Sequence, residues 1–132
     1  MGHGHYNDYG DYSYTFFRTS SESSIKSFEF NAHLDDWEAN RICILVESCE
    51  SGEWADDFAE TPYLAMSTSD EEHSSYYYDD DPSTGEGDFS HWFFEHVDDG
   101  YNAVESYYYA CEQISQEQCP KKQDYSSYVW FS

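Results

Sequence analysis

The strongest fold signal in the chain is a short apolar run, RICILVES, at residues 41–48. Its isoleucines and its valine are β-branched, and such a run is typical of a strand that is covered on both faces. Upstream, DYSYTFFR (residues 11–18) and IKSFEF (residues 25–30) alternate between apolar and polar side chains, as half-buried strands do. We therefore expect these three segments to form an antiparallel meander.

The second half of the chain predicts helices. Asp88 is of a residue type that N-caps prefer, so a helix is expected to begin there. Apolar side chains recur at helical spacing over residues 89–97 and again over residues 104–114. Two more strands are expected, at residues 62–69 and at residues 125–132. Helices therefore follow strands in this sequence, as they do in α+β proteins.

The predicted fold class is α+β, an antiparallel sheet (meander plus C-terminal strand) with two or three helices packed on one face. Residues 1–10 are expected to be a flexible arm rich in Gly and His, and residues 11–132 a single α+β domain. The predicted core consists of Phe28, Phe30, Ile42, Ile44, Val46, Phe89, Trp92, Phe93, Val97, Val104 and Ile114.

The chain is strongly acidic. Its 132 residues include 28 Asp and Glu against 5 Lys and Arg, which gives a formal net charge of −23. Residues 42–120 contain no Lys or Arg, so carboxylates there must find cations in the chain ends, in dissolved ions or in a partner. Such a surface repels nucleic acid and anionic membranes, which excludes both as direct partners. Nine Phe, four Trp and fourteen Tyr supply the large apolar side chains of a folded core.

The sequence has no apolar run long enough to span a membrane and no signal-peptide pattern. We therefore expect a soluble protein of the cytoplasm, or of the host cell cytoplasm if the chain is encoded by a phage. In that compartment cysteines remain thiols, and the spacings here match no zinc motif. The four thiols are Cys43, Cys49, Cys111 and Cys119.

No nucleophile elbow, phosphate-binding glycine loop, zinc protease motif or Ser-His-Asp pattern is present, so we expect a protein that is not an enzyme and uses no cofactor. The loop DDDPSTGEGD at residues 79–88 loosely resembles a calcium loop, with oxygen ligands at Asp79, Asp81, Ser83 and Asp88. It lacks the EF-hand spacing, because Thr84 and Ser90 occupy the positions that need Gly and Glu. A solvated acidic turn before a helix is the simpler interpretation.

Two further groupings are compatible with a metal ion. His91 and Glu95 share a helix face at i, i+4, but two groups do not make a site. The segment GHGH at residues 2–5 offers backbone nitrogens and imidazoles to Cu(II) or Ni(II), and a loose arm is the simpler interpretation. We therefore predict no metal site.

Carboxylates recur every three or four residues over residues 47–60. If this segment is helical, they form one stripe with a carboxylate every ~4.5–6 Å, and a DNA strand presents a phosphate about every 3.4 Å. The tyrosine triple at residues 76–78 cannot bury all its rings on one side, so some are exposed beside carboxylates. Acids next to exposed aromatic rings are the complement of a basic groove that stacks bases. The predicted partner-binding residues are Glu47, Glu50, Glu53, Asp56, Asp57, Glu60, Asp70, Glu71, Glu72, Tyr76, Tyr77, Tyr78, Asp79, Asp80, Asp81, Asp98 and Asp99.

In charge, size and aromatic content the whole chain is similar to the DNA-mimic inhibitors, small acidic proteins often encoded by phages. These proteins block restriction enzymes, CRISPR effectors, repair glycosylases or nucleoid proteins. The resemblance includes no motif, and the inhibitors share no common fold, so no residue is carried over from them. It implies a non-enzymatic decoy of the anti-restriction or anti-CRISPR type, which presents carboxylates as phosphate substitutes in the nucleic-acid channel of a basic target.

Two other classes of protein fit the same composition. A halophilic domain would use its acids to hold water and salt ions, and a calcium-dependent interaction module would use them to bind calcium. The sparse lysine suits the halophile, whereas the four cysteines and the many large aromatic residues do not. Thermal stability in low salt, high salt and millimolar calcium separates these alternatives.

Overall fold

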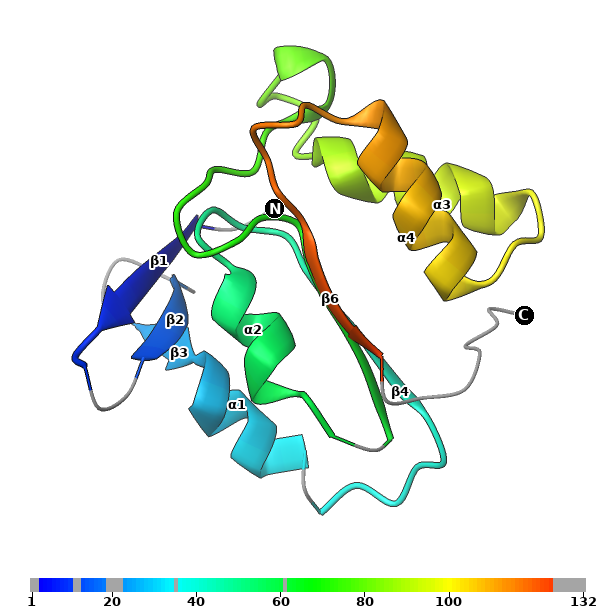
Figure 1. Ribbon diagram of the computed structural model, residues 1–132. Helices are drawn as coiled ribbons and strands as arrows, with labels where there is room; N and C mark the ends of the chain where they lie inside the picture. Colours follow the sequence, from blue (N-terminus) through cyan, green and yellow to red (C-terminus); the bar gives the residue numbers. More distant parts are fainter. Residues whose placement is uncertain (1–2, 11–12, 19–22, 35, 61, 125–132) are drawn as a thin grey trace.

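The computed structural model describes residues 3–10, 13–18, 23–34, 36–60 and 62–124, and its architecture is α+β with two sheets of three strands each (Figure 1). The predicted α+β class is therefore confirmed.

The larger of the two structural units is built on the sheet β4-β5-β6. Its strands are β4 (Ile42–Val46), β5 (Tyr63–Ser67) and β6 (Lys121–Asp124). The first two are parallel, with Ile42 opposite Tyr63, and β6 runs antiparallel to β5. Every residue of the central strand β5 is buried, which is why its sequence is a nearly continuous apolar run.

Helices cover both faces of this sheet (Figure 1). On one face lie α1 (Ser27–Leu34) and α2 (Gly52–Asp57), and on the other lie α3 (Asp88–Asp98) and α4 (Ala103–Gln113). Alternate side chains of β5 point to opposite faces, so two core clusters form. The α3/α4 cluster contains Leu64, Met66, Phe89, Phe93, Ala103, Tyr107, Ala110 and Ile114. The α1/α2 cluster contains Leu34, Trp54, Phe58, Tyr63 and Ala65.

This arrangement corrects the prediction that the helices pack on one face. The side chains of β4 show the reason, because both of its faces are apolar. Cys43 and Leu45 pack against the α3/α4 cluster, whereas Ile42, Ile44 and Val46 pack against the α1/α2 cluster. The expectation that residues 41–48 form a strand covered on both sides is therefore confirmed.

The second sheet consists of β1 (His3–Asp8), β2 (Ser13–Arg18) and β3 (Ser24–Lys26), with antiparallel neighbours. An antiparallel meander is therefore present, but its members differ from the predicted ones. Residues 3–8, expected in a flexible arm, supply its first strand, and β4 belongs to the other sheet. The strand predicted at residues 125–132 lies outside the described residues.

The predicted strand at residues 25–30 changes into helix α1 at Ser27. Phe30 and Leu34 lie four residues apart and both join the α1/α2 cluster, where the Phe30 and Trp54 rings are 5.6 Å apart. Phe28 is consequently not a core residue: it is 43% exposed, with its ring against Tyr14. The helical conformation places both Phe30 and Leu34 in the α1/α2 cluster. This burial outweighs the alternation of Phe28 and Phe30, which favours a strand.

The rest of the predicted core is confirmed in the two clusters. Phe89, Phe93 and Ile114 are buried. The others are partly buried and pack against one cluster or the other: Phe30, Ile42, Ile44, Val46, Trp92, Val97 and Val104.

The α3–α4 hairpin has well-defined ends. Gly87 is the N-cap of α3, one position earlier than the predicted cap, and Asp88 is the first helical residue. Gly100 follows α3 with a φ of +95°, a conformation that favours glycine. Asn102 caps α4 through a reciprocal capping box with Glu105. Neither helix exceeds 11 residues, and none of the helices in the described parts of the chain is long and apolar enough to cross a membrane.

Candidate partner-binding surface

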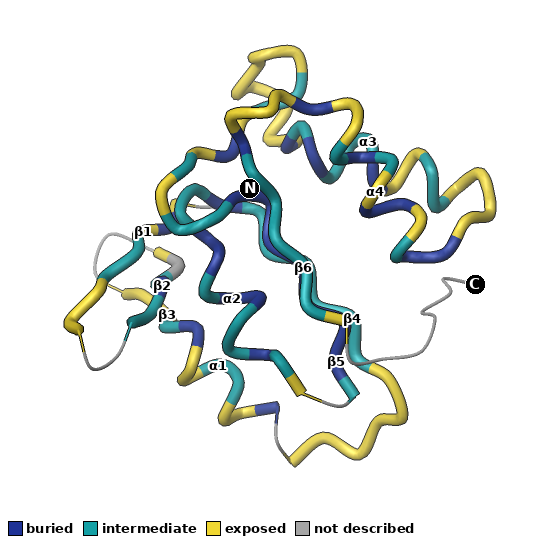
Figure 2. Tube along the Cα trace, in the orientation of Figure 1, coloured by how far each residue is buried: buried dark blue, intermediate teal, exposed yellow. Residues whose placement is uncertain are grey.

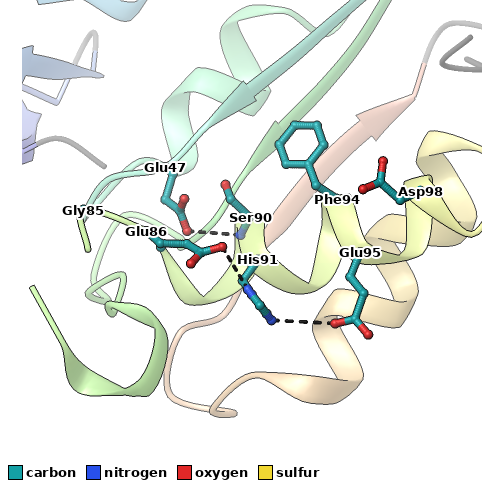
Figure 3. Close-up of a pocket in the computed structure, with 9 residues that line it drawn as sticks. Glu47, Gly85, Glu86, Ser90, His91, Phe94, Glu95 and Asp98 are labelled. Carbon is teal, nitrogen blue, oxygen red and sulfur yellow. Dashed lines mark hydrogen bonds and ion pairs between the residues drawn. The ribbon is translucent and has the colours of Figure 1, made fainter. Parts of the chain in front are cut away.

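An open hollow of about 620 Å³ lies along α3 (Figure 3). We call it the α3 groove. Four of its lining side chains are carboxylates, and none is Lys or Arg, so the groove is electrostatically suited to a cationic side chain. Its lining residues are Glu47, Gly85, Glu86, Gly87, Ser90, His91, Phe94, Glu95 and Asp98.

Glu47, at the end of β4, forms the inner wall of the groove. Its carboxylate accepts a hydrogen bond from the Ser90 backbone N–H at 3.3 Å. Ser90 lies in the first turn of α3, where the helix dipole stabilises a negative charge. Burial raises the pKa of Glu47, and the hydrogen bonds from Ser90 oppose that rise. Gly87 packs directly on this carboxylate, and a Cβ there would overlap it. Glu47 therefore has a structural role in the fold as well as a place in the wall of the groove.

His91 lies between two carboxylates on the outer side of the groove (Figure 3). Its Nδ1 is 2.9 Å from Glu86 Oε1 and its Nε2 is 3.6 Å from Glu95 Oε2. The ring of Tyr78 stacks on the imidazole, with centroids 3.6 Å apart and planes at 15°. The predicted pairing of His91 and Glu95 on one helix face is thus present. Protonation of this histidine would give the groove a cation of its own.

Aromatic rings continue from Tyr78 along α3. Trp92 stands edge-on to Tyr78 and to Tyr109, at 5.9 and 6.5 Å. Tyr109 stacks on His96 at 4.3 Å, and His96 stacks on Tyr101 at 3.9 Å. Large aromatic rings also reach solvent near this face; they are Tyr76, Phe94 and Tyr101. The prediction that the tyrosine triple at residues 76–78 exposes part of its rings is confirmed, because Tyr76 is exposed.

The acidic loop that precedes α3 contains the predicted residues 79–81, all of which are exposed (Figure 2). The 3₁₀-helix η1 (Tyr78–Asp80) holds it, and Asp79 and Asp80 have φ values of +54° and +56°. A second open hollow, of about 410 Å³, lies here between the tyrosines and the end of α4. Its lining residues are Tyr76, Tyr77, Asp79, Asp80, Asp88, Ser115 and Glu117.

The carboxylates of this loop do not converge as calcium ligands do. Asp81 accepts the Ser83 N–H, and Asp88 accepts the Trp92 indole N–H at 3.2 Å. Within the described ranges, three carboxylates approach one another within 4.8 Å only at Glu53, Asp56 and Glu71, none of which belongs to this loop. The geometry therefore gives the calcium-module alternative no support.

The stripe predicted over residues 47–60 does not form, because only Gly52–Asp57 is helical and Glu50 has a φ of +51°. The carboxylate of Glu50 accepts the Tyr6 N–H and lies 2.7 Å from His5 Nδ1. Glu53 accepts the Ser13 hydroxyl at 2.5 Å, and Glu60 is exposed.

Asp56 and Asp57 point to two different elements. Asp56 binds the Lys121 ammonium at 2.6 Å, on β6. Burial raises the pKa of Asp57, which lies beside Ser27 of α1. The acids of α2 are therefore divided among several elements of the fold.

Residues 70–72 follow β5 and separate from one another. Glu71 contacts Lys121, and Glu72 is exposed. Asp70 accepts hydrogen bonds from the backbone N–H groups of Glu72 and His73, at 2.9 and 3.0 Å. Asp98 and Asp99, at the end of α3, are exposed, and Asp98 lines the groove.

The structure thus brings part of the predicted surface together around α3 and the 76–81 segment, and it directs the α2 acids elsewhere. Sequence reasoning omitted Glu86, Phe94 and Glu95 from the partner-binding set, although they lie in the groove. The i, i+4 spacing of His91 and Glu95 was the available signal for this face.

A search of known protein-family models found no match to this chain, and a search of curated proteins found no similar sequence.

Proposed function

We propose that this protein is a non-enzymatic inhibitor or decoy. It presents carboxylates in place of nucleic-acid phosphates and occupies the nucleic-acid-binding channel of a basic target, as anti-restriction and anti-CRISPR proteins of phages do. The observation that carries the proposal is the state of the acids around α3. Within the described chain none of them forms an ion pair with Lys or Arg, and exposed aromatic rings lie among them.

The contrast between the two sides of the molecule supports this proposal. On the α2 side, Asp56 and Glu71 share Lys121, and Glu50 and Glu53 bind groups of the β1–β2 hairpin. On the α3 side, acids at 79–81, 86, 95, 98 and 99 are exposed to solvent; of these, Glu86 and Glu95 lie beside His91, which is a cation only when protonated. An acid already neutralised inside the fold gains little from a partner, whereas an exposed acid keeps its charge for a partner's cations.

The chemistry of the partner follows from this surface. Carboxylates in an open groove attract Lys and Arg, and exposed Tyr and Phe rings offer stacking surfaces to guanidinium groups. A net charge of −23 steers such a partner over long range and makes the encounter sensitive to salt. The target class is therefore a nucleic-acid-binding protein, such as a restriction enzyme, a CRISPR effector or another DNA-handling protein, in the cytoplasm where such targets act.

The test measures binding of the labelled chain to a restriction enzyme, a CRISPR effector, a repair glycosylase and a nucleoid protein. We expect one of these classes to bind it, to lose its nucleic-acid activity, and to release it when its own DNA is added in excess. Binding to none of the four, or binding that survives saturation with DNA, contradicts the proposal.

A charge-matched pair of variants locates the surface. Asp79→Lys, Asp80→Lys and Asp81→Lys together should weaken binding at least about tenfold, the equivalent of 1.4 kcal/mol. Asp36→Lys, Glu38→Lys and Glu60→Lys change the net charge equally on exposed positions away from α3, and should weaken it much less. Equal losses in the two variants would show that only total charge matters.

A further inference from the structure

At the carboxyl end of the parallel pair β4–β5, three side chains of different chemistry meet. The imidazole of His73, a carboxylate oxygen of Asp70 and the Cys119 sulfur offer ligand atoms that all lie within 4.8 Å of one another. Asp70 and His73 belong to the turn after β5, and Cys119 precedes β6, which pairs with β5. All three side chains are half-buried, so solvent reaches the cluster.

We propose that Asp70, His73 and Cys119 bind one Zn²⁺ ion, with a water molecule as the fourth ligand. A thiolate, an imidazole and a carboxylate form a donor set that zinc prefers, whereas calcium and magnesium require oxygen ligands. Tetrahedral zinc with its usual bond lengths sets ligand atoms about 3.3–3.6 Å apart. The observed separations, all within 4.8 Å, are compatible with that geometry after a small movement of these side chains.

The turn that carries two of the ligands is already fixed. Asp70 Oδ1 accepts the Glu72 and His73 N–H groups and lies 2.6 Å from His73 Nδ1. The His73 carbonyl in turn accepts the Glu50 N–H at 2.8 Å. The carboxylate is therefore oriented before a metal arrives.

The third ligand comes from a segment with an unusual backbone. Cys119 has a φ of +50°, which is uncommon for a residue with a Cβ, and its thiol lies 3.3 Å from the Gln116 carbonyl. The preceding residue, Gln118, is fully buried, and neither of its amide atoms has a hydrogen-bond partner. Buried amide groups normally form hydrogen bonds, so the side chain of Gln118 is unsatisfied at this end of the sheet.

The acidic trio nearby shows by contrast why the mixed cluster is the metal site. Glu53, Asp56 and Glu71 also lie within 4.8 Å of one another, but Lys121 binds two of them. That trio takes its cation from the chain itself. The Asp70–His73–Cys119 cluster contains no ammonium or guanidinium group, and the net charge of −23 attracts a divalent cation to it.

Two of the other thiols, Cys43 and Cys111, are less suited to bind a metal as thiolates. Burial raises the pKa of Cys43 to about 11, and burial also raises the pKa of Cys111. When zinc binds, the Cys119 thiol gives its proton to solvent and the sulfur lone pair forms the bond to the metal, with no change in oxidation state. Zinc would then join the turn after β5 to the start of β6.

Cobalt titration of the full chain tests the site, because a thiolate-to-Co²⁺ charge-transfer absorption reports a bond to sulfur and ignores the many carboxylates. We expect one equivalent of Co²⁺ per chain to give that absorption, and Zn²⁺ but not excess Mg²⁺ to abolish it. Cys119→Ser should eliminate the absorption, and the matched control Cys49→Ser should keep it. His73→Gln should weaken the metal affinity at least about tenfold.

The absence of the absorption in the parent protein would overturn the proposal, and so would its persistence in Cys119→Ser or its loss in Cys49→Ser. A second measurement needs no substitution. Zn²⁺ should protect Cys119 from alkylation in the parent protein and leave Cys49 as reactive as before, as read by peptide mass mapping. Equal alkylation of Cys119 with and without zinc contradicts the site. This result is independent of whether the chain inhibits a nucleic-acid-binding protein.

Discussion

The ammonium group of Lys121 lies 2.6 Å from Asp56 Oδ2, although the two residues are 65 positions apart in the chain. The same ammonium contacts Glu71. Residues 42–120 contain no Lys or Arg, so this contact is how the C-terminal part of the chain supplies that segment with a cation. It also joins α2, the turn after β5 and strand β6.

Replacement of Lys121 by Met should destabilise the protein by about 1–2 kcal/mol, the value of hydrogen bonds to charged groups reduced for partial exposure. The substitution leaves Asp56 and Glu71 close together without a cation. Urea unfolding followed by circular dichroism measures the change. The control Lys122→Met removes the neighbouring cation, which lies over the rings of Tyr107 and Tyr108, and should cost less.

A second substitution shows whether charge is the cause. Glu71→Gln in the Lys121→Met background removes part of the repulsion and should restore some of the lost stability. If the double variant is no more stable than Lys121→Met, the ammonium acts through packing of its stem and not through its charge.

Adjacent phenylalanines on α3 give a matched test of the core. Phe93 is buried in the α3/α4 cluster and Phe94 is 49% exposed beside the groove. Phe93→Ala should cost about 3–5 kcal/mol of unfolding free energy. Phe94→Ala should cost far less, in the same urea titration. Similar losses would mean that α3 presents a different face to the sheet.

The fold could be predicted where one periodicity acted alone. The apolar run at residues 41–48 and the helical stripe at residues 89–97 each pointed to one structure, and each was confirmed. Residues 25–30 satisfied two periodicities, and the choice depended on Trp54 and Phe58, which pack on Phe30 only after the chain has folded. Tertiary packing of that kind overrides local preference.

The site was harder to predict because carboxylates occur everywhere in this sequence. Glu50 and Glu53 look like members of one stripe, but their partners are in the β1–β2 hairpin, more than 35 residues away. The Asp70–His73–Cys119 cluster depends on the pairing of β5 with β6, which joins residues distant in the chain. No local pattern records either contact.

Several carboxyl groups make the pH dependence of stability unusual. The pKa is raised, mainly by burial, in four of them: Glu47, Glu53, Asp57 and Asp88. A carboxyl group with a raised folded pKa binds more protons when folded, so its stabilising contribution is full below the unfolded pKa and is lost as pH rises through the folded pKa. The free energy of unfolding should therefore increase as pH falls from 7 toward the ordinary glutamate pKa of 4.5.

Two groups reverse this trend at lower pH. Hydrogen bonds lower the pKa of Asp70 and of Asp81, so their contribution is present above the ordinary value of 3.8 and is lost as pH falls through their folded pKa. Urea titrations across this range should thus show a maximum near the ordinary carboxyl values. Glu47→Gln should be more stable than the parent at pH 7 and lose that advantage as pH falls. A parent protein that is most stable at neutral pH contradicts the assignment.

Salt should stabilise the folded chain. Screening limits the repulsion among its excess carboxylates to a range of about 8 Å at physiological ionic strength. The melting temperature should rise from low to moderate sodium chloride, in spite of the weakening of the Lys121 contacts. A flat curve would indicate that more of the acids are paired than the α3 side suggests, and a requirement for molar salt would favour the halophilic alternative.

Aromatic rings and carboxylates of the α3 side should contribute differently to target binding. Tyr76 is 36% exposed and lines the hollow beside Asp79 and Asp80, so its ring is accessible to a partner. Tyr76→Ala should cost about 1–3 kcal/mol of binding free energy, because stacking is lost, and should leave the slope of log affinity against log salt unchanged.

The triple reversal of residues 79–81 should instead reduce that slope, because fewer carboxylates remain to be screened with the target's Lys and Arg. Affinity measured by fluorescence at several salt concentrations gives both quantities for each variant. The contribution of the Tyr76 ring and that of the acidic loop, two of whose three reversed acids line the same hollow, would then be separable by their response to salt alone. If Tyr76→Ala changes the slope as much as the triple reversal does, the ring acts by placing the acidic loop and not by touching the target.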